Sequence, residues 1–154
     1  MRITVGHLYP DYLNIYADRG NIAVLSERAR LRGHELDVHA IGMRDPVPGD
    51  IDLFYVGGGQ DREQALVARD LADKAETLHA AADDGAAFLA VCGGYQLLGR
   101  SYLDVAGEEL PGIGLLPLHT VAGKRRMIGD VLLDCAWAGQ TLAGFENHAG
   151  RTIL

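Results

Sequence analysis

Short apolar runs alternate with longer amphipathic stretches along the first hundred residues. The runs are too short for core helices and are rich in Val, Ile, Leu, Phe and Ala, which is typical of strands in a buried sheet. They are residues 3–8, 35–41, 51–56 and 86–91. The last run contains no polar residue, so we expect that strand to be buried on both faces.

The stretches between these runs repeat apolar residues every three or four positions, as an amphipathic helix does. Residues 18–33 form one predicted helix, capped by Gly33, and residues 61–84 form a second. Asp61 and Gln64 have the spacing of a capping box at the start of the second helix. The alternation of strand and helix predicts an α/β fold, with a mostly parallel sheet and helices on both faces.

The pattern changes after residue 103. Three further apolar runs, separated by glycine turns, predict short strands. They are residues 115–121, 127–133 and 144–148. The chain has no repeat, no low-complexity tract and no linker that would divide it, so we expect one domain over residues 1–154.

Composition narrows the possible functions. The formal net charge is −7, so the chain lacks the basic surface of a nucleic-acid-binding protein or a membrane-surface helix. No run approaches the ~20 apolar residues of a membrane span, and the N-terminus has no signal-peptide pattern. The two cysteines, Cys92 and Cys135, have no C-x-x-C or zinc-site spacing. These features favour a reducing, cytoplasmic compartment.

Cys92 stands between the fourth apolar run and a third helical stretch. Gly93 and Gly94 follow it and allow a sharp strand-turn-helix connection, like the elbow that presents a nucleophile above the edge of a sheet. A helix N-terminus favours the thiolate, and the amide of Gly93 could hold a developing oxyanion. The alternative is that Cys92 is a small buried hydrophobic residue. The glycine pair and the abrupt change from strand to helix favour a nucleophile.

A glycine loop, residues 57–59, follows the third strand. In a parallel sheet this loop and Cys92 meet at the carboxyl edge, where ligands bind. We therefore expect Gly58 and Gly59 to supply a second oxyanion donor beside that of Gly93. A phosphate cradle is the alternative, but no G-K-[ST] follows the loop and Asp61 would repel phosphate.

Four segments together resemble the class I, triad-type glutamine amidotransferases, in particular their cobyric-acid-synthase-like branch. The segments are residues 12–21, 56–64, 92–99 and 144–152. The segment around Cys92 resembles the whole superfamily, whereas the other three specify the branch. The resemblance covers nearly the whole chain and implies a flavodoxin-like amidotransferase fold. One position departs from the branch, because Ala149 stands where glycine is usual.

The resemblance also implies site roles. Cys92 would attack the side-chain amide of glutamine and form a thioester with release of ammonia. Arg126, Gln96 and His148 are the expected substrate-binding residues. A guanidinium suits a substrate carboxylate because two parallel N–H donors match two oxygens. On charge pattern alone, residues 124–126 would be a solvated turn, so the role of Arg126 depends on the resemblance.

No histidine is an evident catalytic base. His7 lies near the carboxyl end of the first strand, and His148 lies in the last family segment, which makes it the better candidate for a site residue. The resemblance places the catalytic histidine beyond residue 154. We therefore expect the sequence to be truncated at its C-terminus, to lack the last part of the fold, and to have weak or no glutaminase activity by itself. The alternatives are that His148 replaces the missing base or that the fragment is inert.

The resemblance implies no metal, nucleotide or other cofactor for this chain. It implies that ammonia passes to a Mur-ligase-like, ATP-dependent synthetase of the MurT type. That synthetase would amidate the D-glutamate of the lipid II stem peptide to D-isoglutamine in peptidoglycan biosynthesis. Two alternatives stay open: the amidotransferase domain of a corrinoid amidating synthase, and a non-catalytic scaffold that keeps the fold.

Overall fold

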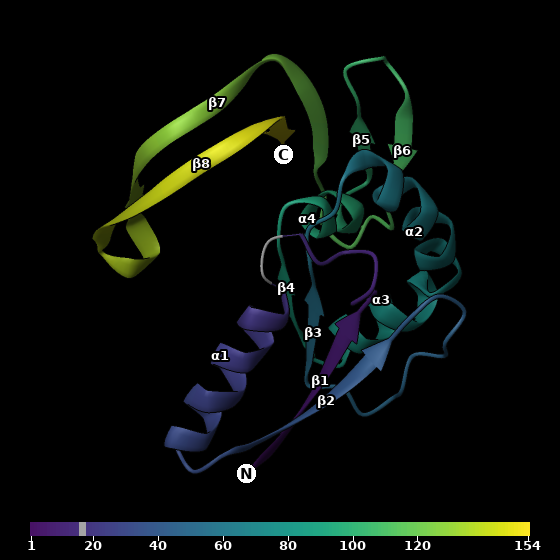
Figure 1. The fold of residues 1–154 in the computed structure, drawn as a ribbon, viewed down its shortest axis with the longest axis vertical. Helices are drawn as coiled ribbons and strands as arrows, with labels where there is room; N and C mark the ends of the chain where they lie inside the picture. Colours follow the sequence, from purple (N-terminus) through teal and green to yellow (C-terminus); the bar gives the residue numbers. More distant parts are fainter. Residues whose placement is uncertain (16–17) are drawn as a thin grey trace.

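The N-terminal part of the protein is a parallel sheet (Figure 1). The computed structural model describes residues 1–15 and 18–154. The family segment at residues 12–21 thus includes residues 16 and 17, which lie outside the described residues. The strands of the sheet are β1 (Arg2–Leu8), β2 (Glu35–Ile41), β3 (Leu53–Val56) and β4 (Ala87–Ala90). Their order is β2-β1-β3-β4, and all neighbouring pairs run parallel.

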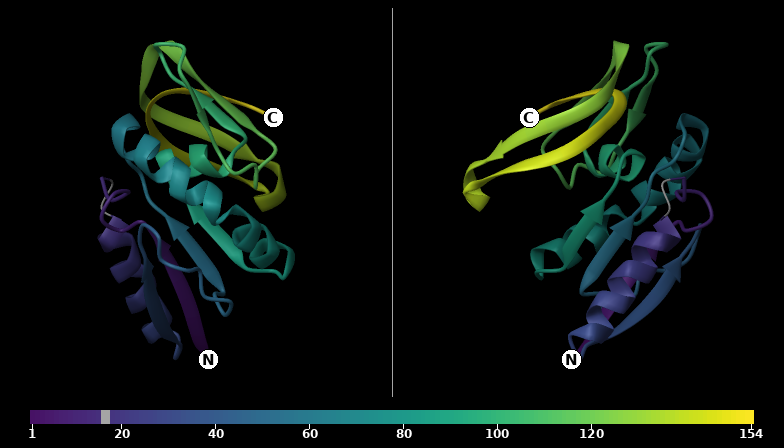
Figure 2. Two further views of the ribbon diagram at one scale, coloured as in Figure 1. Left: turned by 90° about the vertical axis from the view of Figure 1, so that its right-hand side faces the viewer. Right: turned by 60° about the vertical axis from the view of Figure 1, so that its left-hand side comes forward.

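Helices cover both faces of this sheet. α1 (Asp18–Leu31) connects β1 to β2, whereas α2 (Asp61–Asp73) and α3 (Ala75–Asp83) connect β3 to β4. Parallel crossovers are right-handed, and these two proceed in opposite directions along the sheet, so their helices lie on opposite faces. Figures 1 and 2 show this arrangement. The predicted α/β class is confirmed, and so is the cap of the first helix, since Gly33 has a φ of 75°.

The prediction of one unbroken helix over residues 61–84 is wrong. α2 and α3 meet at Lys74, whose ammonium group is buried against the carboxylate of Asp70 one turn earlier. Leu71 and Leu78 are nevertheless both fully buried. The apolar periodicity therefore continues across the break, which is why the sequence did not reveal it.

The predicted capping box is also wrong. The N-cap of α2 is Gln60, and no side chain caps that end of the helix. The side-chain amide of Gln64 instead donates to the carbonyl oxygen of Gly59, at 3.0 Å. Gln64 thus stabilises the glycine loop rather than the helix terminus.

β4 is not buried on both faces, contrary to the prediction. Leu89 is 42% exposed, and exposure alternates along the strand. The reason is its position: β4 is the last strand in the order, and the described helices leave one of its faces uncovered.

The C-terminal part forms a second sheet with the order β6-β5-β7-β8. Its strands are β5 (Ser101–Leu103), β6 (Glu109–Pro111), β7 (His119–Cys135) and β8 (Gln140–Ile153). β7 and β8 form a long antiparallel hairpin that projects from the first sheet (Figures 1 and 2). Its register is interrupted between Ala122 and Met127, and the short helix η1 (Ala136–Ala138) joins the two strands.

The prediction of three short strands in this region is therefore wrong. Gly123 lies between two of the predicted strands but falls within β7, beside the interruption of its register. The predicted ends at residues 133 and 144 are absent because pairing continues from Val131–Gly144 to Cys135–Gln140. Cross-strand pairing outweighs the weak intrinsic preference of glycine against strands.

The main core lies between the parallel sheet and α2, α3 and α4 (Gly93–Leu98). Phe54 and Val56 contribute from the sheet, and Val67, Leu78 and Leu97 from the helices. None of the described helices is long and apolar enough to cross a membrane. This core fixes α4 behind the end of β4, where the candidate site begins.

Candidate active site

Cys92 occupies a sharp turn between β4 and α4. Its backbone has a φ of 51° and a ψ of −112°, a region that side-chain-bearing residues rarely adopt. Such strain typically costs about 1–3 kcal/mol and persists where the surrounding structure imposes it. The predicted strand, turn and helix are present, and the side chain of Cys92 is exposed at the turn.

The turn packs directly against the glycine loop. The amide of Gly94 donates to the carbonyl oxygen of Gly57 at 3.0 Å. A Cβ atom on Gly94 would lie 2.6 Å from the carbonyl oxygens of both Val56 and Gly57, closer than backbone atoms allow. Only glycine at position 94 therefore lets the ends of β3 and β4 approach one another in this way.

All three carbonyl groups of the glycine loop are hydrogen-bonded to the protein. Gly57 accepts from Gly94, Gly58 accepts from the amide of Ile15 at 3.2 Å, and Gly59 accepts from the side chain of Gln64. In a planar trans peptide the N–H points opposite to the C=O. The amide hydrogens of Gly58 and Gly59 are therefore turned away from these partners.

The amide hydrogens of Gly58, Gly59 and Gly93 have no acceptor in the described part of the protein. All three glycines are buried, and none of them lines the cavity at Cys92. Gly93 follows Cys92 directly, whereas Gly58 and Gly59 follow β3, the strand that pairs with β4. Fixed, unpaired amides of this kind can stabilise an oxyanion without reorganisation.

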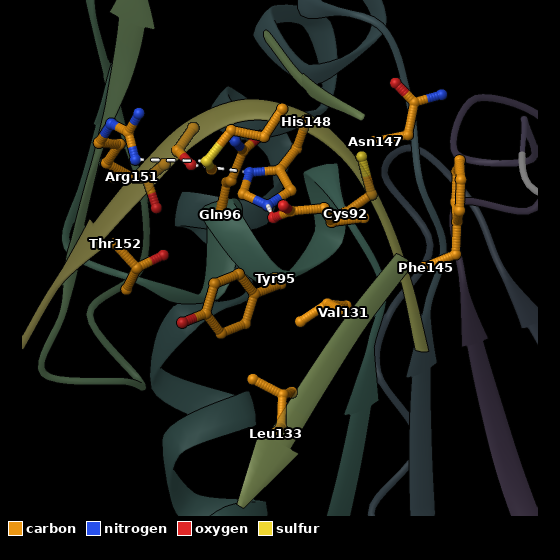
Figure 3. Close-up of a pocket in the computed structure, with 14 residues that line it drawn as sticks. Cys92, Tyr95, Gln96, Val131, Leu133, Phe145, Asn147, His148, Arg151 and Thr152 are labelled. Carbon is orange, nitrogen blue, oxygen red and sulfur yellow. Dashed lines mark hydrogen bonds and ion pairs between the residues drawn. The ribbon is translucent and has the colours of Figure 1, made fainter. Parts of the chain in front are cut away.

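A cavity of about 860 Å³ opens between the Cys92 turn and the β7–β8 hairpin. Cys92, Gln96 and His148 lie on its wall (Figure 3), so three of the predicted site residues are together. Its other lining is largely apolar and comes from the hairpin; it includes Met127, Val131, Leu133 and Phe145. The register of the hairpin brings these residues together, and sequence analysis missed them because it divided the hairpin into short strands.

Arg126 does not line this cavity. It lines a neighbouring one of about 480 Å³, together with Arg125 and Arg151. Its guanidinium donates to the side-chain oxygen of Asn147 at 2.7 Å and to the carbonyl oxygen of the same residue at 3.2 Å. Asn147 itself lines the Cys92 cavity, so one residue links Arg126 to the predicted site.

His148 has an acceptor at each ring nitrogen. Nδ1 lies 2.8 Å from the carbonyl oxygen of Gly150, and Nε2 lies 3.2 Å from a carboxylate oxygen of Glu146. Both contacts are hydrogen bonds at once only when both nitrogens carry a proton. This arrangement leaves no free nitrogen to take up a proton from Cys92, and a ligand could use a ring N–H of His148 only by displacing one of these two contacts.

The other candidate histidine, His7, lies elsewhere. It is buried and packs edge-on against Tyr55, with ring centroids 5.2 Å apart, and it does not line the cavity. Within the described ranges, no three His, Cys, Asp or Glu side chains are grouped to hold a metal ion.

Comparisons with known proteins identify the family of the chain. The CobB/CobQ-like glutamine amidotransferase domain matches residues 4–154. The GatD subunit of the glutamine-hydrolysing lipid II isoglutaminyl synthase of Staphylococcus aureus is 41% identical over 151 residues, 97% of this chain and 62% of that protein. The Streptococcus pneumoniae subunit of the same name is 36% identical over 155 residues, 99% of this chain and 60% of that protein.

Structural comparison supports the fold. A chain in the structure of PurLQS from Thermotoga maritima has a TM-score of 0.64 at 16% identity, covering 99% of this chain and 70% of that chain. The family and the fold expected from the sequence are thus both confirmed. The present chain spans about 60% of the length of the curated relatives that it matches.

Proposed function

Since the chain belongs to the CobB/CobQ-like glutamine amidotransferase family, we propose that it is the part of a glutaminase subunit that carries the nucleophile. The single observation that supports this best is the strained, exposed Cys92 beside a glycine loop whose carbonyl groups are all held by other elements. The names of the GatD relatives describe a subunit of a synthase, which supports a partner subunit for this chain as well. We propose that this partner is a Mur-ligase-like, ATP-dependent synthetase and that both act in the cytoplasm. The product would be a lipid II stem peptide whose D-glutamate is amidated to D-isoglutamine.

The proposed chemistry starts at the sulfur of Cys92. The thiolate attacks the side-chain amide carbon of glutamine, and a C–S bond forms while the carbonyl π electrons move to oxygen. The amides of Gly58, Gly59 and Gly93 hold the resulting oxyanion. The proton lost by the thiol is transferred to the amide nitrogen, the C–N bond then breaks, and ammonia leaves with a thioester remaining on Cys92. Water then hydrolyses the thioester to glutamate and regenerates the thiol.

His148, Gln96 and Arg126 are proposed to bind glutamine. Gln96 and His148 share the cavity of Cys92, so both lie beside the space that a glutamine bound at Cys92 would occupy. The role of Arg126 is supported by its two hydrogen bonds to Asn147, because that residue lies on the cavity wall.

Replacement of Arg126 tests this role. For Arg126→Lys in the full-length protein with its partner, we expect KM for glutamine to rise about 10- to 100-fold, with kcat within about threefold of wild type. Lysine keeps the charge but loses the paired donors that match a carboxylate. Arg125→Lys is the matched control and should leave KM unchanged. An equal rise in KM for both variants would show that general positive charge, not Arg126, assists binding.

Reconstitution of the complex with its partner tests which molecule accepts the ammonia. Full-length protein, its Mur-ligase-like partner, ATP and lipid II should yield amidated lipid II with glutamine as the nitrogen source, and ammonium chloride should replace glutamine. Cobyrinic acid in place of lipid II should give no amidated product. The alternative function, amidation of a corrinoid, is suggested by the description of the family. Amidation of the corrinoid and not of lipid II would favour this alternative. Amidation of neither acceptor, together with no glutamine hydrolysis, would favour the scaffold.

A further inference from the structure

We propose that Gln64 is a positioning residue for the oxyanion site, acting on Gly59 and Gly93 at once; this inference rests on the proposed function. Gln64 belongs to the first turn of α2 and is 3% exposed. It does not line the cavity at Cys92, so its effect on the reaction would pass through the two glycines.

The first contact is with the glycine loop. Nε2 of Gln64 donates to the carbonyl oxygen of Gly59 at 3.0 Å. Ile15 holds the carbonyl of Gly58 on the preceding side. The Ile15 contact orients the peptide that carries the Gly59 N–H, and Gln64 holds the peptide that follows, so the backbone on both sides of Gly59 is fixed. The reverse orientation of the Gln64 amide would set two oxygen acceptors against each other, so the donor role of Nε2 follows.

The second contact is with the turn after Cys92. A Cβ atom built on Gly93 would lie 2.8 Å from both Cδ and Nε2 of Gln64. The planar amide of Gln64 thus packs against the backbone of Gly93 and limits its movement toward α2. One side chain therefore contacts both of the backbone segments that supply the proposed oxyanion donors.

Packing alone does not account for glutamine here. Oε1 of Gln64 is buried and receives no donor from any described residue. A buried acceptor without a donor costs free energy that a methionine or leucine of similar size would avoid. A polar side chain at this place is therefore explained by the hydrogen bond to Gly59, which only its amide nitrogen can make.

Gln64→Met in the full-length protein with its partner tests the inference. We expect kcat for glutamine hydrolysis to fall about 10- to 100-fold with KM within about twofold, since donors displaced from the oxyanion lose transition-state stabilisation selectively. Glutamate γ-semialdehyde is the second probe. Its aldehyde carbon adds the Cys92 sulfur to form a hemithioacetal whose oxygen would occupy the oxyanion site. Its Ki should rise by the same factor as kcat falls, while the rate of Cys92 alkylation by iodoacetamide stays unchanged.

Gln60→Met is the matched control, because Gln60 is exposed, lies at the start of the same helix and makes no side-chain cap. It should behave as wild type in all four measurements. Equal kcat for the two variants would overturn the inference, and so would a parallel loss of kcat and of thiol alkylation. If Gln64→Met does not fold, Gly93→Ala tests the same contact. In the wild-type background this substitution should lower kcat strongly, because the added methyl group meets the Gln64 side chain. In a Gln64→Ala background, which has room for the methyl group, the further loss of kcat should be small. Additive losses would contradict contact between the two residues.

Failure of this inference can be separated from failure of the proposed function. If Cys92→Ser still hydrolyses glutamine, both the proposed function of Cys92 and the inference about Gln64 are wrong. If hydrolysis requires Cys92 but is unchanged in Gln64→Met, only the inference about Gln64 is wrong.

Discussion

Cys92→Ser should abolish glutamine hydrolysis by the full-length protein with its partner. Loss of a catalytic nucleophile typically lowers kcat by about 10⁶-fold, and here the serine hydroxyl would have to react without the acidity of a thiol. Glutamine-dependent amidation of lipid II should disappear with it, whereas amidation with ammonium chloride should stay at the wild-type rate. The measurements are glutamate release, and amidated product with each nitrogen source.

Cys135→Ser is the control for this result. Cys135 ends β7, is half-buried, and does not line the Cys92 cavity. The control variant should keep both activities. Retained hydrolysis in Cys92→Ser would exclude the proposed nucleophile, and loss of the ammonium-dependent reaction as well would point to a broken complex rather than lost chemistry.

The substitution Asp70→Asn should strongly lower the stability of the folded protein. The carboxylate of Asp70 accepts from the hydroxyl of Tyr9 at 2.7 Å and from the amide of Arg44 at 2.7 Å, and it pairs with the ammonium of Lys74. Asp70 and Lys74 are both about 7% exposed. Asparagine leaves the Lys74 charge buried without its counter-charge, so we expect the free energy of unfolding to fall by about 3–5 kcal/mol. This corresponds to a Tm lower by roughly 6–20 °C.

The pH dependence of this effect has a definite sign. Burial by itself raises the pKa of Asp70, but hydrogen bonds from the Lys74 ammonium, the Tyr9 hydroxyl and a backbone amide outweigh burial and lower the pKa below its usual value of 3.8. A lowered carboxyl pKa contributes stability that is complete above the unfolded-state value and is lost as the pH falls through the folded-state value. The Tm difference between wild type and Asp70→Asn should therefore be constant near neutrality and shrink below about pH 4.

Two variants complete this test. Asp70→Asn/Lys74→Met removes the unpaired charge and should recover most of the lost Tm. Glu27→Gln breaks an exposed pair with Arg30 on α1 and should leave Tm close to wild type. A wild-type Tm for Asp70→Asn would show that the buried pair of Asp70 and Lys74 contributes little to stability. If the double variant does not recover the Tm, the stability was lost through the contacts of Asp70 with Tyr9 and Arg44.

The short-range features of the fold were predictable because they depend on neighbouring residues. Apolar runs and helical spacing placed β1, β2, β3 and α1 to within two residues of their observed ends. Gly33 ends α1 as expected because its conformation is a local property. The turn at Cys92 was also predictable, since a strand, two glycines and a helix in immediate succession leave the chain few other paths.

The errors arose where distant segments decide the outcome. The break at Lys74 comes with a buried carboxylate that is itself held by the hydroxyl of Tyr9, 61 residues earlier. The length of β7 and β8 depends on pairing between strands, which overrode the glycines within them. Gln64 has the spacing of a capping residue but bonds to Gly59, because the loop carbonyl lies within reach only in the folded chain.

By itself, the sequence determined the α/β class, the family and the exposed thiol at a turn, because each is encoded in a continuous stretch of chain. Only the tertiary structure decided which groups surround that thiol. It fixed the carbonyls of the glycine loop, brought the hairpin over Cys92 and placed Arg126 in the neighbouring cavity. The hydrogen bond from Ile15 to Gly58 and the one from Gly94 to Gly57 join distant parts of the chain, and their geometry follows from strand pairing and core packing that no local pattern contains.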